Sequence, residues 1–131
     1  IIFAWDELNA LAKDSLEAAR HKLMDILCNY AGYRKCVPIL VFDAYRVKGA
    51  GREQETWHNL HVIYTREAET ADMFIERATH ELAKNHRVRV VSSDGAEQII
   101  ILGNGALRVS ARAFEREVRA VEAEIREFLD Q

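Results

Sequence analysis

The feature of this sequence that most constrains its fold is the alternation of short apolar runs with segments of helical periodicity. Val37 to Phe42 is a continuous apolar run, typical of a strand that is buried on both faces of a sheet. Apolar residues at 60–64, 88–91 and 107–109 predict three further short strands. An alternation of this kind predicts an α/β fold, with a mostly parallel central sheet and helices on both faces.

Two helices are predicted in the first two thirds of the chain from apolar residues spaced three and four apart. The first spans residues 15–31, with Asp14 and Glu17 as a capping box and Gly32 at its C-terminal cap. The second runs from Thr70 to Asn85, with the threonine as its N-terminal cap. Both helices are expected to pack their apolar faces on the sheet.

Two more helices are predicted in the last third of the chain. Gly95 to Leu102 is expected to form a short helix that ends at Gly103. Ser110 is expected to cap a long final helix. The apolar stripe of that helix consists of Phe114, Val118, Val121, Ile125 and Phe128.

Length and composition narrow the class of protein further. A chain of 131 residues is expected to form a single domain over residues 1–131. The net charge of −3 excludes a strongly basic protein that coats nucleic acid, but not a local basic patch. The two cysteines, Cys28 and Cys36, are too few for a disulfide scaffold and indicate reduced thiols in a cytosolic protein. No apolar run is long enough to cross a membrane.

The first residues of the chain are apolar and do not begin with methionine. The opening Ile1-Ile2-Phe3-Ala4 resembles a chain cut inside or just after a strand. We therefore expect the sequence to be truncated at its N-terminus, with a further strand before residue 1.

Three aspartates follow predicted strands. Asp43 comes directly after the strand 37–42, Asp94 follows the strand 88–91, and Asp72 lies in the segment after the strand 60–64. The carboxyl ends of parallel strands meet at one edge of a sheet, so we expect these carboxylates to converge there. Each aspartate taken singly could instead be a helix cap or a turn residue.

Convergence of like charges favours a cation at this edge. Carboxylates that gather at one place repel one another unless a cation neutralises them. Hard oxygen ligands suit Mg²⁺ or Mn²⁺, and such an ion can activate water and hold a phosphodiester. Glu69, Glu97 and Ser93 lie nearby in the sequence and are candidate supporting residues.

The polar segment 44–58 is expected to be a long loop, and loops of this length are often functional. Basic side chains in this loop could hold a phosphate backbone, and its tyrosine could stack on a base. An ordinary solvated loop is an equal alternative. The candidate RNA-binding residues are Tyr45, Arg46, Lys48 and Arg52.

Three segments together resemble the YacP-like branch of the NYN domain family. They are Val41-Phe42-Asp43-Ala44-Tyr45-Arg46-Val47-Lys48-Gly49, Glu69-Thr70-Ala71-Asp72 and Ser92-Ser93-Asp94-Gly95-Ala96-Glu97-Gln98. The resemblance implies a compact α/β/α domain that shares its fold with PIN-domain nucleases. It also implies a divalent-metal acidic site and endoribonuclease activity in the bacterial cytoplasm or the plastid stroma, linked in some members to ribosomes.

The resemblance implies, by matching of motifs, that Asp43, Asp72 and Asp94 are the catalytic and metal-binding residues. It also implies that Arg46 and Lys48 face RNA. The implied substrate is RNA (mRNA, or also rRNA or tRNA), the ribosome is an implied partner, and we expect a monomer or weak dimer without membrane contact. The family's first motif, an Asp-Gly-Tyr-Asn segment, has no counterpart in this sequence. Because that aspartate would be a further ligand, we expect the chain that begins at Ile1 to cleave RNA poorly by itself.

Two alternatives to the nuclease remain open. A module of the same fold could bind RNA or the ribosome without catalysis. A receiver-like phosphoacceptor domain also gathers acidic residues at strand ends, but it needs a lysine after the last strand. The segment Leu107 to Ser110 offers none, which disfavours this class.

The basic loop generates a prediction. If Arg46 and Lys48 contact phosphates, replacing both with alanine should weaken RNA binding and reduce the slope of log K against log salt by about two, at roughly 0.7–0.9 per contact. Filter binding at several salt concentrations measures this slope. An unchanged slope would make 44–58 an ordinary solvated loop.

Overall fold

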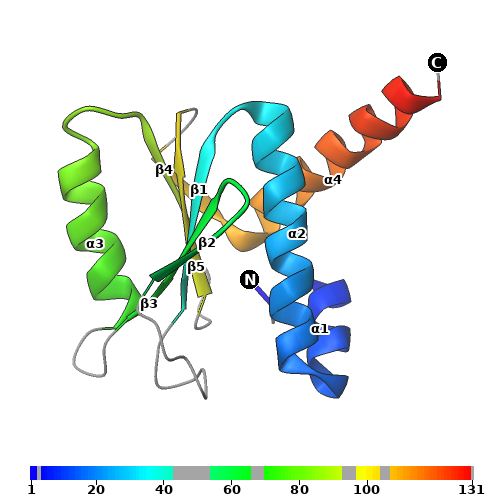
Figure 1. Cartoon of the computed structure of the whole chain (residues 1–131), viewed down its shortest axis with the longest axis horizontal. Helices are drawn as coiled ribbons and strands as arrows, with labels where there is room; N and C mark the ends of the chain where they lie inside the picture. The colour runs from blue at the N-terminus through cyan, green and yellow to red at the C-terminus, as the bar shows by residue number, and fades with distance from the viewer. Residues whose placement is uncertain (3, 43–53, 66–69, 93–96, 104–106, 131) are drawn as a thin grey trace.

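The computed structural model describes residues 1–2, 4–42, 54–65, 70–92, 97–103 and 107–130. In this part of the chain, strands form one six-stranded sheet of order β2-β3-β1-β5-β4-β6 (Figure 1). Strands β1, β3, β4 and β6 point in the same direction, whereas β2 and β5 run against them. The strands are β1 (Val37–Phe42), β2 (Gln54–Trp57), β3 (Leu60–Tyr64), β4 (Val88–Ser92), β5 (Glu97–Leu102) and β6 (Arg108–Ser110).

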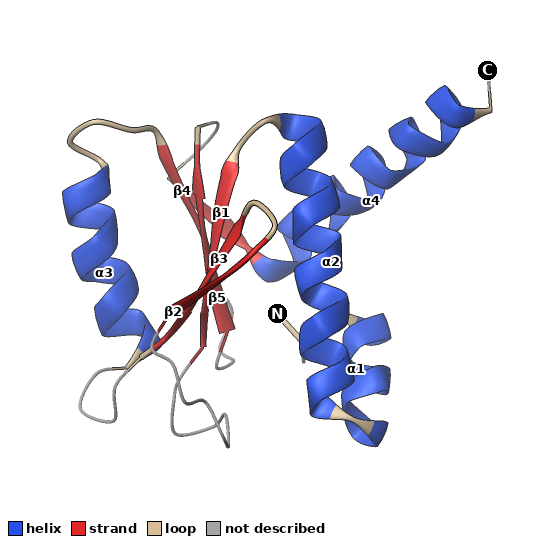
Figure 2. Cartoon of the chain, in the orientation of Figure 1, coloured by secondary structure: helices blue, strands red, loops and turns tan. Residues whose placement is uncertain are grey.

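Helices cover both faces of this sheet. Figure 2 shows α1 (Asp6–Asp14), α2 (Leu16–Arg34) and α4 (Ala111–Leu129) on one face and α3 (Ala71–Leu82) on the other. The arrangement is a three-layer α/β/α domain, which confirms the predicted fold class. Within the described part of the chain the sheet is mixed, because three of its five strand pairings are antiparallel. None of the helices in the described ranges is long and apolar enough to cross a membrane.

The core follows the alternation of side chains along the strands. On β1, Leu40 and Phe42 face the layer of three helices, whereas Ile39 and Val41 face α3. The larger cluster also contains Ile1 and Ile2, both fully buried, and Trp5, whose indole N–H donates to the carbonyl of Ala111 at 2.8 Å. The side chain of Trp5 thereby joins the start of the chain to the start of α4.

The prediction of a short helix from Gly95 to Leu102 is wrong, because residues 97–102 form strand β5. This strand pairs on one side with β1 and on the other with β4, both antiparallel. Ile99, Ile100 and Ile101 are all buried, so the segment contacts both layers of helices. Three consecutive β-branched residues suit a strand that is buried on both faces better than a one-sided helix.

The ends of α2 also differ from the prediction. Its N-terminal cap is Ser15, whose hydroxyl oxygen accepts from the backbone N–H of Ala18 at 3.1 Å, while Asp14 ends the preceding helix α1. Gly32 lies inside the helix, which continues to Arg34. Lys35 ends it in the left-handed region at φ 55°, a conformation that more often selects glycine.

Two elements were not predicted from the sequence. Helix α1 precedes α2, with Leu8 as its buried residue. Strand β2 occupies part of the segment 44–58, which was predicted to be a loop throughout. It pairs antiparallel with β3 at the edge of the sheet, where most of its residues are exposed.

Helix α4 matches its predicted cap but not its whole predicted stripe. The Ser110 hydroxyl accepts from the N–H of Ala113 at 3.1 Å, and Phe114, Val118 and Val121 are buried. Ile125 is partly buried against the same core. Phe128 is 73% exposed, because the last turns of α4 project away from the sheet (Figure 1).

This difference along α4 generates a prediction. Phe114→Ala should lower the free energy of unfolding by about 3–5 kcal/mol, because the ring is fully buried and its loss leaves a cavity. Phe128→Ala is the matched control and should change it by less than about 0.5 kcal/mol. Urea unfolding of both variants measures the difference. Similar losses in the two variants would contradict this placement of α4.

Tyr64, at the end of β3, generates a pH prediction. Burial, together with the hydrogen bond from its hydroxyl to Glu55 Oε1 at 3.1 Å, raises the pKa of Tyr64 to about 12. Protonated Tyr64 therefore stabilises the fold below the ordinary pKa of about 10, and this contribution is lost as the pH rises from 10 toward 12. In a 295 nm absorbance titration, Tyr64→Phe should remove tyrosinate signal at the high-pH end. If Tyr64→Phe instead removed tyrosinate signal near pH 10, this would contradict the burial of the Tyr64 hydroxyl.

Candidate functional site

The candidate site lies at the edge of the sheet where the parallel strands end. Phe42, the last residue of β1, pairs with Tyr64 at the end of β3 and with Glu97 at the start of β5. Ser92, at the end of β4, pairs with Ser110, which ends β6 and is the N-terminal cap of α4. The carboxyl ends of β1, β3, β4 and β6 and the N-terminal end of α4 therefore lie at the same end of the sheet, which we call the strand-end edge.

Asp72 is the predicted site aspartate that the structure describes. It lies in the first turn of α3, where a negative charge is favourable near the helix N-terminus, and its residue is exposed. Thr70 caps this turn, because its side-chain oxygen accepts from the N–H of Met73 at 3.1 Å. Asp72 Oδ1 accepts a hydrogen bond from the side-chain amide of Gln98.

Gln98 belongs to the site but was not predicted as a site residue. It is 4% exposed and lies on β5 opposite Val41, on the face of the sheet that α3 covers. Its neighbours on that face of β5, Ile100 and Leu102, are apolar. A glutamine at an apolar position is the signal that could have identified it, but this signal appears only when the segment is interpreted as a strand.

The ends of β1 and β3 are joined by a backbone hydrogen bond. Thr65 follows β3, and its N–H donates to the carbonyl of Phe42 at 3.0 Å. The Thr65 side chain is buried, and its hydroxyl contacts the same carbonyl at 3.4 Å. The ends of β1 and β3 are therefore held together directly before the segments that contain Asp43 and Glu69.

Most of the other predicted site residues lie outside the described part of the chain. Asp43 is the residue after Phe42, and Asp94 is two residues after Ser92, so both follow strand ends at this edge. Their positions and roles stay predictions. The same holds for the side chain of Glu97, whose backbone begins β5, and for Glu69, Ser93, Tyr45, Arg46, Lys48 and Arg52.

The donor chemistry of this edge fits a hard divalent cation. Asp72 offers an exposed carboxylate, one oxygen of which accepts a hydrogen bond from the buried Gln98 amide. Among the described residues, no three His, Cys, Asp or Glu side chains gather closely enough to hold a metal. A complete ligand set would therefore need carboxylates from the segments outside the described residues.

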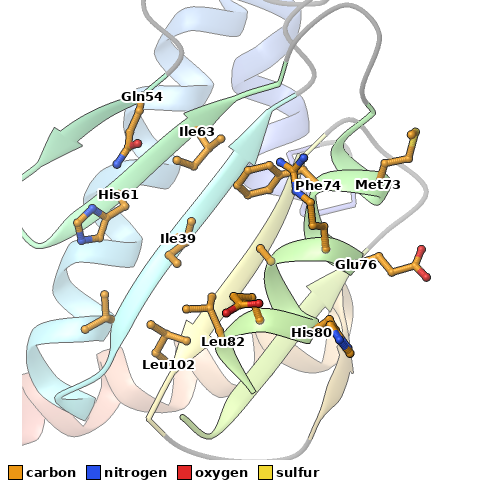
Figure 3. A pocket seen from close by; sticks show the side chains of 14 residues that line it. Ile39, Gln54, His61, Ile63, Met73, Phe74, Glu76, His80, Leu82 and Leu102 are labelled. Atoms are coloured by element: carbon orange, nitrogen blue, oxygen red, sulfur yellow. The ribbon is translucent and has the colours of Figure 1, made fainter. Parts of the chain in front are cut away.

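An open groove of about 1350 Å³ lies beside the candidate site, between α3 and the sheet. Its floor is largely apolar and includes Ile39, Ile63 and Leu102. Figure 3 shows Phe74 and Leu82 of α3 across from these strand residues, with His61 on the sheet side. Asp72 and Gln98 are not among the residues that line this groove, so it is distinct from the candidate metal site.

Similarity to known proteins extends along nearly the whole chain. The model of the YacP-like NYN domain matches residues 1–131. The uncharacterized protein YacP from Bacillus subtilis (strain 168) is 42% identical over 126 residues, which cover 95% of this chain and 74% of that protein. The crystal structure of Rae1 (YacP) from Bacillus subtilis matches with a TM-score of 0.77 at 35% sequence identity. That match covers 98% of this chain and 74% of Rae1, and it supports the PIN-like fold. The chain therefore belongs to the YacP-like NYN domain family.

Proposed function

We propose that this protein is a divalent-metal-dependent endoribonuclease whose active site lies at the strand-end edge. NYN domains are generally nucleases, and NYN and PIN-like nucleases generally use divalent metals. The observation that carries the proposal is the exposed Asp72 carboxylate, held by a buried amide where β1, β3 and β4 end. The strand ends at this edge also lead into the segments that contain Asp43 and Asp94.

In this proposal Asp72, Asp43 and Asp94 hold Mg²⁺ or Mn²⁺. When bound, the ion supplies an activated water and neutralises charge on the phosphodiester. Asp72 holds its carboxylate at a fixed place, because α3 begins at a capped turn and Gln98 restricts the rotation of the side chain. Glu69, Glu97 and Ser93 are supporting residues in the same proposal.

RNA is the proposed substrate, and the segment after Asp43 is its proposed contact. Arg46, Lys48 and Arg52 carry the positive charge that a phosphate backbone needs, and Tyr45 offers a ring for stacking. Messenger RNA on the ribosome is the target that we propose first. The relative from Bacillus subtilis supports a bacterial cytoplasm as the compartment.

An aspartate substitution tests the proposal. In the full-length protein, Asp72→Asn should reduce the rate of cleavage of an end-labelled single-stranded RNA in Mn²⁺ buffer by about 100-fold or more. Loss of an outer-shell partner alone costs about 10–100-fold, so loss of a ligand should cost at least as much. Glu76→Gln is the matched control, because Glu76 is exposed one turn further along α3. It should cleave at the wild-type rate.

Two results would contradict the proposal. Equal cleavage rates for the wild-type protein and Asp72→Asn would show that Asp72 is not an active-site residue. RNA binding without cleavage by the wild-type protein, with Mg²⁺ or Mn²⁺ present, would support the alternative of a non-catalytic RNA-binding module.

A further inference from the structure

We propose that Gln98 is a positioning residue that holds the Asp72 carboxylate in the orientation in which it binds the divalent cation. The inference rests on the proposed function, since it assigns a partner to one residue of that site. It concerns a side chain on β5, one of the two central strands of the sheet, and its hydrogen bond to Asp72 of α3.

The first step of the argument is the burial of Gln98. Burial of a side-chain amide without a hydrogen-bond partner costs free energy of folding, so buried amides in folded proteins have a partner. Gln98 is 4% exposed, whereas Asp72 is exposed. The bond between them therefore runs from the packed interior, beside Val41 and Ile100, to a carboxylate that solvent can reach.

The second step is the chemistry of an amide donor. A lysine or arginine at this position would also orient Asp72, but its positive charge would compete with a metal ion for the carboxylate. The glutamine amide is neutral at every pH at which the protein folds, and it donates without adding charge. The pair therefore fixes one carboxylate oxygen and leaves the negative charge of Asp72 available to a cation.

The third step concerns the two elements that the hydrogen bond joins. Asp72 belongs to α3 and Gln98 belongs to β5, and these elements are in contact. A purely structural tie between them is the competing explanation. The two explanations differ in one readout: a structural tie affects the free energy of unfolding, whereas a positioning residue affects the affinity for the metal in a folded protein.

The experiment measures Mn²⁺ binding by electron paramagnetic resonance in the full-length protein without RNA. Gln98→Met keeps the length of the side chain and removes the donor, and Gln98→Leu is a second variant in case the first fails to fold. We expect the dissociation constant for Mn²⁺ to rise about 10-fold or more, the usual effect of losing an outer-shell partner. Gln54→Met is the matched control, because Gln54 lies exposed on the edge strand β2, and it should bind Mn²⁺ as the wild type does.

A double-mutant cycle with Asp72→Asn distinguishes failure of the positioning role from failure of the proposed metal site. We expect Gln98→Met to have no further effect on Mn²⁺ affinity when Asp72 is already replaced. If Asp72→Asn weakens binding but both folded Gln98 variants bind as tightly as wild type, Gln98 is a structural tie and the positioning role is wrong. If wild type and Asp72→Asn bind equally, the proposed metal site itself is wrong.

Discussion

Strand β1 is the element on which the rest of the structure depends. It pairs parallel with β3 on one side and antiparallel with β5 on the other, and it contacts both layers of helices. Its register sets Phe42 opposite both Tyr64 and Glu97, so three segments of the chain meet at one point. A shift of one residue would turn Leu40 and Phe42 toward α3 and empty the larger core, so the position of the strand-end edge is fixed by packing.

The same register explains how a buried residue can influence a surface carboxylate. Gln98 is the second residue of β5, opposite Val41, and the side-chain alternation of that strand directs it toward α3. Asp72 is in the first turn of α3, which starts shortly after β3 ends. Backbone pairing in the sheet therefore determines which side chain lies beneath Asp72, and a neutral donor there is compatible with a cation above it.

Sequence periodicity predicted the elements whose apolar residues lie on one face or form an uninterrupted run. The strand 37–42, the helix from Thr70 and the cap at Ser110 are present in the structure, because each depends on local chemistry. The order of strands and helices along the chain was enough to predict the edge of the sheet at which the aspartate-bearing segments begin.

The errors have a common physical origin in tertiary contacts. The segment 97–102 is a strand because β1 and β4 flank it, and short apolar runs do not by themselves distinguish a strand from a helix. Phe128 continues the apolar spacing of α4 but lies beyond the surface on which the helix packs. Gln98 could not be identified as a site residue because its role depends on both of these facts about β5: that it is a strand, and that α3 covers one face of it.

Paramagnetic broadening by Mn²⁺ tests the central claim most directly, because it locates the ion without relying on catalysis. Substoichiometric Mn²⁺ added to ¹⁵N-labelled full-length protein broadens amide signals close to the bound ion. The account predicts early loss of the signals of Thr65, Asp72, Ser92 and Gln98, while those of Val37 and Asn85, at the opposite end of the sheet and of α3, stay sharp. Early broadening around Glu122 and Glu124 of α4, with the strand-end signals unchanged, would contradict it.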